Sequence, residues 1–115
     1  MTTMQLIHPQ WLLIKSGTKT IEMRLNDAKR RTLQIGETVD FIDLTTSQHL
    51  VTRLISIQSY PNFESLLSQY TAVQVGSAPE TPVTQMVQEM LTLYSPTQVQ
   101  QLGVVALQIQ PLIRQ

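Results

Sequence analysis

The chain has 115 residues and no cysteine, and its eight basic and eight acidic residues cancel at neutral pH. A chain of this length suits one domain around one core, and we expect residues 1–115 to form it. The lack of cysteine excludes disulfides, thiolate zinc sites and thiol nucleophiles, while two separated histidines, His8 and His49, are too few for a metal site. No apolar run reaches the roughly 20 residues that span a bilayer, and no secretory signal begins the chain. We therefore expect a cytoplasmic protein with no metal, cofactor or membrane partner.

The placement of the charges carries more information than their sum. Charged residues make up 14% of the chain, against about 25% in an average domain, and a neutral total does not produce the broad positive field of a non-specific nucleic-acid binder. Six of the eight basic residues nevertheless lie in one short stretch: Lys15, Lys19, Arg24, Lys29, Arg30 and Arg31. Such a cluster is typical either of a solvated face or of a surface that binds anions.

The first part of the chain predicts a short helix followed by a strand. We expect residues 8–17 to form the helix, with Pro9 in its first turn and Trp11 in the core or as a staple, and Gly17 can take the left-handed conformation that ends it. Residues 20–25 alternate polar and apolar side chains, which is the period of a half-buried strand. We expect residues 26–31 to form a polar, basic loop.

The rest of the chain predicts two strands, three helices and a final strand. In order, these elements cover residues 38–44, 50–59, 61–70, 82–94, 95–103 and 104–112. The apolar stripe of the fourth of them is more typical of a core than of a cofactor site. The last strand is apolar on both faces, which favours a central position in a sheet. This mixture predicts an α+β domain around a curved sheet or small barrel.

The segment Trp11–Leu25 resembles the signature of the ASCH (activating signal cointegrator homology) family. That signature is a short helix ending in glycine, then G-x-K-x-x-E-x-R entering the first strand, and here it reads Gly17-Thr-Lys19-Thr-Ile-Glu22-Met-Arg24. Four further segments are similar to the family pattern in the same order: Gln34–Phe41, Tyr60–Leu66, Tyr94 and Gly103–Ile109. The resemblance spans nearly the whole chain. It implies a PUA-like fold, a small β-barrel of curved mixed sheet with short helices around a cleft.

The resemblance also implies a ligand related to RNA or nucleotides. Some small bacterial relatives hydrolyse the acyl amide of N4-acetylcytidine, and others have been proposed as ribonucleases. The hydrolytic relatives share Lys19 but carry a threonine nucleophile where this chain has Glu22, and a carboxylate does not inherit the role of a hydroxyl in acyl transfer. Thr20 is nearby but does not match the motif, and Glu80 corresponds either to the relatives' second acid or to a solvated loop residue. We therefore do not carry the acetylcytidine activity over to this chain.

The charged residues of the motif have complementary chemistry. Glu22 and Arg24 lie two residues apart and share one face of the strand, whereas Lys19 joins them only from the bend after Gly17. Arg24 suits a bidentate contact with phosphate or carboxylate, and Lys19 suits a point charge. Glu22 can accept from the exocyclic amine of a base, or act as a general base if burial raises its pKa. The alternative is that Glu22 and Arg24 form an ion pair that only supports the strand.

Three functions follow from these residues. The favoured one is a binding module for RNA or a modified nucleoside or nucleotide, with a basic loop on the phosphates and a tyrosine for stacking. Its ligand-binding residues are Lys19, Glu22, Arg24, Lys29, Arg30, Arg31 and Tyr94. The second is a small hydrolase of an acylated base or an RNA phosphodiester, with Glu22 as base and Lys19 stabilising negative charge. The third is a regulatory interaction domain whose cleft is filled by its own side chains or closed by residues 72–81.

Overall fold

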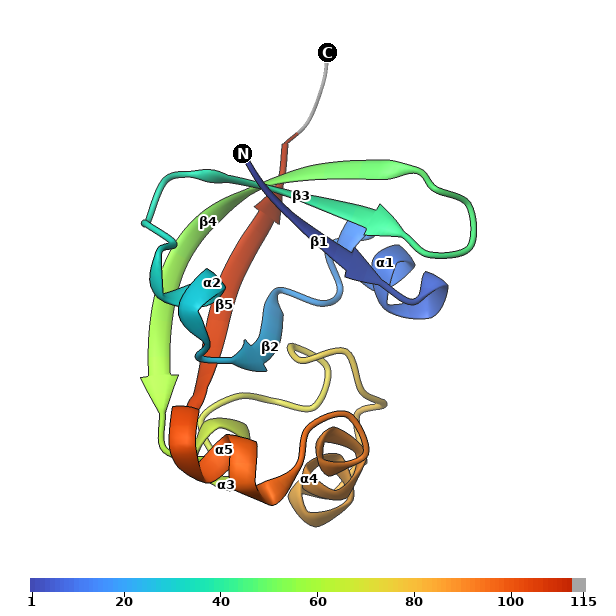
Figure 1. Cartoon of the computed structure of the whole chain (residues 1–115). Coiled ribbons are helices and arrows are strands. Elements are labelled where there is room, and N and C mark those ends of the chain that lie inside the picture. The colour runs from blue at the N-terminus through green and yellow to red at the C-terminus, as the bar shows by residue number, and fades with distance from the viewer. Residues whose placement is uncertain (113–115) are drawn as a thin grey trace.

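The computed structural model describes residues 1–112, whose strands form one curled, five-stranded sheet (Figure 1). Strand order is β1-β3-β4-β5-β2, with β1 and β3 parallel and all other neighbours antiparallel. The strands are β1 (Thr2–Leu6), β2 (Ile21–Leu25), β3 (Thr38–Asp43), β4 (His49–Tyr60) and β5 (Val104–Pro111). A bulge at Ile55 interrupts the pairing of β4 with β5 and helps the long strand to bend. The predicted α+β class and curved mixed sheet are confirmed.

Five short helices accompany the sheet in this order: α1 (His8–Lys15), α2 (Ala28–Arg31), α3 (Phe63–Leu67), α4 (Val83–Leu91) and α5 (Pro96–Leu102). Figure 1 shows α3, α4 and α5 grouped at the end of the sheet where β4 ends and β5 begins, while α1 lies beside β3. We refer to α3, α4 and α5 together as the helical layer. Its α5 contacts the edge strand β2, whose Ile21 and Leu25 belong to the core beneath the layer.

Strand β5 separates two hydrophobic cores, which confirms that it is central. Val105 and Leu107 face the core inside the curl, where Trp11 of α1 packs and donates from its indole Nε1 to the Phe41 carbonyl at 2.9 Å. Val104 and Ala106 face the opposite way, into the core beneath the helical layer. An apolar side chain on each successive position is therefore needed to bury both faces of this strand.

Local signals in the sequence predicted several element ends correctly. The capping box at the start of α5 is present, because Ser95 Oγ accepts from the Gln98 N–H at 3.1 Å and Gln98 Oε1 accepts from the Ser95 N–H at 3.0 Å. α1 stops before Gly17, whose φ of +82° lies in the left-handed region that favours glycine.

Other predictions were wrong at short elements. The expected loop over residues 26–31 contains α2, which Asp27 caps by accepting from the Arg30 N–H at 3.1 Å. One helical turn is too short to show a 3.6-residue period, so polarity alone suggested a loop. α3 ends at Leu67 and does not reach Tyr70, and β1 was not predicted at all. β1 buries only two side chains, and it forms because β3, more than 30 residues away, supplies its hydrogen bonds.

Candidate functional site

Three charged side chains of the predicted motif meet at β2. The two oxygens of Glu22 divide between the cations: Oε1 lies 2.8 Å from Lys19 Nζ, and Oε2 lies 2.7 Å from Arg24 Nη2. Arg24 Nε also donates to Oε2 at 2.8 Å. Glu22 and Arg24 occupy the same face of β2, as their spacing requires. We call Lys19, Glu22 and Arg24 the charged triad.

Lys19 reaches the triad from the bend that links α1 to β2. Its backbone N–H donates to the Leu13 carbonyl at 3.0 Å, which closes the chain reversal after Gly17. The Lys19 side chain then extends to Glu22, which lies three residues later in the chain. The differing parity of the two residues therefore does not separate them, because Lys19 precedes the first residue of the strand.

Burial and the neighbouring charges shift the pKa of Glu22 in opposite directions. The residue is 4% exposed, and burial by itself raises the pKa of its carboxyl group. The charges and hydrogen bonds of Lys19 and Arg24 outweigh that effect and hold the pKa below its ordinary value of 4.5. Glu22 is therefore ionised at neutral pH, and both of its oxygens have cationic partners. The condition for a general base, a pKa raised by burial, is not met.

A glutamine and a glycine cover the Lys19 side of the triad. Gln10 of α1 accepts from Lys19 Nζ at 2.7 Å and donates through Nε2 to the Gly76 carbonyl at 3.1 Å. Gly76 has φ of +92°, and a Cβ atom there would lie 2.3 Å from Gln10 Oε1 and 2.8 Å from Lys19 Cδ. The segment 72–81 thus packs directly on the lysine, which is only 4% exposed. The sequence predicted closure by residues 72–81 only as part of the third function, and it did not predict the contacts of Gln10 and Gly76 with Lys19.

Two cations bridge the open side of the curled sheet. Arg24 Nη2 donates to the Gln5 carbonyl at 2.8 Å, and Lys29 Nζ donates to the Thr3 carbonyl at 2.6 Å. β1 and β2 are the two edge strands of the sheet, so Arg24 of β2 joins edges that no backbone ladder connects, while Lys29 reaches β1 from α2. The oxygens that they contact on β1 are neutral backbone carbonyls, although Arg24 also pairs with the Glu22 carboxylate.

The other two cations of the predicted loop lie on α2. Arg30 Nη1 pairs with Asp27 Oδ2 at 3.1 Å, while its Nε is buried without a hydrogen-bond partner among the described residues. Arg31 Nε donates to the Asn26 carbonyl at 2.9 Å from an exposed position. We call Arg24, Lys29, Arg30 and Arg31 the basic seam, because they follow the β1–β2 opening and the turn beside it.

Tyr94 lies between the helical layer and this seam. One face of its ring stacks on buried Phe63, with the ring centroids 6.0 Å apart and the planes 20° apart. Burial raises the pKa of the Tyr94 phenol, and the positive charge of Arg24 opposes that shift. The positive charge of the Arg30 guanidinium also lowers the pKa of the phenol. Tyr94 is thus close to the seam, but its ring already has one aromatic neighbour.

Both histidines pair with aspartates of β3, which the sequence did not indicate. His8 Nδ1 lies 2.5 Å from Asp43 Oδ2, and His49 Nδ1 lies 2.7 Å from Asp40 Oδ2. Burial by itself raises the pKa of Asp43, but hydrogen bonds from His8 and from the following turn lower it to about 2. His8 and Asp43 are 35 residues apart, so no local pattern could reveal their contact. The pair ties the first turn of α1 to the end of β3.

Within residues 1–112, the acid considered from the sequence as a second catalytic group, Glu80, makes no polar contact with the triad. Glu80 is exposed in the segment 72–81, and no hydrogen bond or ion pair in residues 1–112 joins it to the triad. Within the same part of the chain, no three acidic or histidine side chains cluster in a way that could hold a metal ion. The described helices are also too short and too polar to cross a membrane.

Comparisons with known proteins identify the fold. No protein-family model matches the chain, and no curated protein matches it. The crystal structure of the hypothetical protein PH0355 is similar, with 29% identity and a TM-score of 0.84 over 96% of this chain and 97% of its own. The solution structure of PF0455 from Pyrococcus furiosus has 28% identity and a TM-score of 0.74 over 98% of both chains. A mutant of ZmASCH from Zymomonas mobilis has 16% identity and a TM-score of 0.68 over 95% of this chain and 68% of its own.

The chain has the ASCH fold. The curled mixed sheet with short helices that the resemblance of Trp11–Leu25 implied is confirmed at the level of the fold. An ASCH fold carries different activities in different proteins, so the function of this one has to be argued from its own side chains.

Proposed function

We propose that this protein is an RNA- or nucleotide-binding ASCH module whose basic seam holds phosphate groups. The observation that carries the proposal is the gathering of cations at one opening of the sheet. Residues 15–31 contain six basic and two acidic side chains, while the rest of the chain contains two basic and six acidic ones. The positive charge of this neutral chain is therefore concentrated in one segment, which suits an anionic ligand.

The acceptors that the seam cations now have support this role. Arg24 and Lys29 donate to the carbonyls of Gln5 and Thr3, and Arg31 donates to the carbonyl of Asn26. Hydrogen bonds from a cation to an ionised oxygen are shorter and about twice as strong as those between neutral groups. A phosphate can therefore compete with these carbonyls for Lys29, Arg31 and the outer edge of Arg24, while Arg24 keeps its contacts with the Glu22 carboxylate.

The charged triad has a different part in this proposal. Lys19 and Glu22 are both 4% exposed and already contact each other, so they are poorly placed to meet a ligand first. The Arg24 side chain is 16% exposed and is the member of the triad that reaches the seam. Glu22 accepts from two of its nitrogens and so holds the guanidinium in one orientation. Glu22 and Lys19 thus position Arg24, and Tyr94 borders the same region.

A second function is favoured by the closure of the site. Gln10 and Gly76 cover Lys19, which is the arrangement expected of an interaction domain whose charged motif is internal and structural. Hydrolysis has no such support, because Glu22 is an ionised partner of two cations and its pKa is lowered rather than raised. Binding measurements separate the two remaining functions.

The test is fluorescence anisotropy with short labelled RNAs, together with calorimetry on nucleosides and nucleoside monophosphates. We expect RNA binding at low salt that weakens as salt rises, because cations on the protein displace condensed counterions. Lys29→Ala and Arg31→Ala should each weaken binding and lower the salt slope by about 1.

The matched control is Arg53→Ala. Arg53 also donates to a backbone carbonyl, that of Gly36 at 2.6 Å, but it lies outside the seam. It should leave RNA affinity nearly unchanged. If no RNA or nucleotide binds at low salt, or if Arg53→Ala weakens binding as much as Lys29→Ala, the proposed function is wrong and the internal, structural reading of the motif stands.

A further inference from the structure

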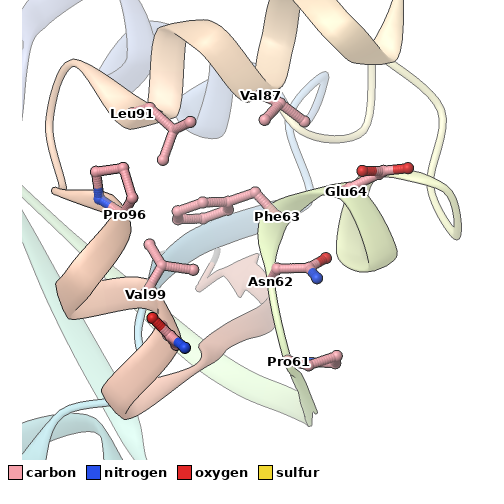
Figure 2. Close-up of a pocket in the computed structure, with 9 residues that line it drawn as sticks. Pro61, Asn62, Phe63, Glu64, Val87, Leu91, Pro96 and Val99 are labelled. Carbon is pink, nitrogen blue, oxygen red and sulfur yellow. The ribbon is translucent and has the colours of Figure 1, made fainter.

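An apolar groove opens in the helical layer, and none of the four basic-seam residues lines it. It has a volume of about 450 Å³, and Figure 2 shows the ring of Phe63 at its centre, between Leu91 of α4 and the Pro96–Val99 side of α5. Val87 of α4 and the segment leading into α3 complete the walls. The groove thus lies where three short helices meet without filling the space between them.

The groove exists because the apolar stripe of α4 is only partly covered. The sequence predicted that this stripe belongs to the core, and Met86 is buried as expected. Val87 is half-buried and Leu91 is 38% exposed, although both point toward the groove. α3 has five residues and ends before it can cover that part of α4. An exposed apolar surface with a concave shape is a common mark of a binding site.

The charge around the groove has one sign. From residue 54 to residue 112 the chain contains no lysine, arginine or histidine, but it contains Glu64, Glu80 and Glu89. Glu64 lines the groove beside Val87, and within residues 1–112 no cation forms an ion pair with it. The apolar opening therefore has one carboxylate, that of Glu64, and no cation among its lining residues.

We propose that this groove binds a basic amphipathic segment of a partner protein. Large apolar side chains of the segment, spaced for one face of a helix, enter between Leu91 and Phe63, and a lysine or arginine beside them pairs with Glu64. An acidic segment has no cation to meet on the helical layer and is repelled by its carboxylates. RNA is excluded for the same reason. The proposal is independent of the proposed function, because it involves other residues and a ligand of opposite charge.

The test uses two short synthetic helical peptides with the same leucine positions, one with lysines and one with glutamates on the polar face. Isothermal titration calorimetry on the full chain should show one-to-one binding of the lysine peptide. The glutamate peptide should bind at least about tenfold more weakly. Leu91→Asp should weaken the lysine peptide by at least about tenfold, because it places a charge in the apolar contact. Glu64→Lys should reverse the preference between the two peptides.

Two matched controls separate the groove from general stickiness and general charge. Leu93 is 69% exposed just beyond α4 and does not line the groove, and Glu80 is an exposed acid away from it. Leu93→Asp and Glu80→Lys should leave both peptide affinities nearly unchanged. Thermal melting should show that Leu91→Asp remains folded, since the side chain is already partly in water.

Several outcomes would overturn the proposal. Equal affinity for the two peptides would show that charge does not select the partner, and equal losses in Leu91→Asp and Leu93→Asp would show that the groove does not form the contact. If neither peptide binds, the proposal is also refuted. A dimer in light scattering that Leu91→Asp dissociates would assign the groove to a second copy of this chain instead. Lys29→Ala should not change peptide binding, so failure here is distinguishable from failure of RNA binding at the seam.

Discussion

Replacing Glu22 with glutamine tests the energetic role of the charged triad. The substitution keeps the size of the side chain but removes the one negative charge that faces Lys19 and Arg24. The Lys19 and Arg24 side chains are 5% and 16% exposed, so neither can recover full solvation without moving. Glutamine has only one acceptor oxygen, so it can accept from Lys19 or from Arg24. Its amide NH2 group then faces the other cation, and two donors cannot form a hydrogen bond.

The expected cost is about 3 kcal/mol in the free energy of unfolding. Removing one partner of a buried ion pair typically costs about 3–5 kcal/mol. We take the lower end because Arg24 retains its hydrogen bond to the Gln5 carbonyl and Lys19 retains its bond to Gln10. This loss is a large part of the roughly 5–15 kcal/mol that stabilises a small domain.

The stability lost in Glu22→Gln should depend on pH in a definite direction. The folded-state pKa of Glu22 lies below its ordinary value of 4.5. The stability that this shift provides is present above pH 4.5 and is lost as pH falls through the folded-state value. The difference in stability between the natural chain and Glu22→Gln should therefore be largest at neutral pH and shrink on acidification.

Urea unfolding followed by circular dichroism, repeated across pH, measures both quantities. Glu80→Gln is the matched control, and as a change at an exposed acid it should alter stability by less than about 0.5 kcal/mol. Lys19→Met combined with Glu22→Gln should cost less than the sum of the single changes, because the two residues are in contact. If Glu22→Gln is as stable as the Glu80→Gln control at neutral pH, the triad does not stabilise the fold and the reasoning above is refuted.

Three further changes test other parts of the structure by urea unfolding. Gly76→Ala should cost about 1–3 kcal/mol from backbone strain and more from its clash with Gln10, whereas Gly36→Ala, with φ of +93° and no atom within 4 Å, isolates the strain. Equal costs would disprove the contact. Asp43→Asn should be less stable than the natural chain at pH 7 and approach it near pH 2, because the contribution of Asp43 is present above its ordinary pKa of 3.8 and lost through about 2. Ser95→Ala should cost about 1 kcal/mol through loss of the cap, and no change would argue against it.

Much of the site geometry could be predicted because it depends on neighbouring residues. The parity of Glu22 and Arg24 follows from the two-residue period of a strand, and the bend that brings Lys19 to them is formed within six residues of Leu13. The capping box at Ser95 is local in the same way. The functional roles of these residues stay predictions, since they concern a ligand rather than the chain.

The contacts that cover and extend the triad could not be predicted, because each joins distant parts of the chain. Gln10 and Gly76 are 66 residues apart, and Arg24 reaches a carbonyl 19 residues before it. The exposure of Leu91 is of the same kind. Its helical spacing indicates an apolar face, but the packing of the three helices leaves Leu91 38% exposed.

The sequence by itself determined the ASCH-like motif, the order of most elements and the central position of β5. These depend on side-chain period, caps and turns, whose energetics act over a few residues. Only the tertiary structure decided that Lys19 and Glu22 are covered, that Arg24 and Lys29 reach the edge strand β1, and that the helical layer keeps an apolar groove. Such features arise when separate elements pack, and packing depends on which distant surfaces meet rather than on local order.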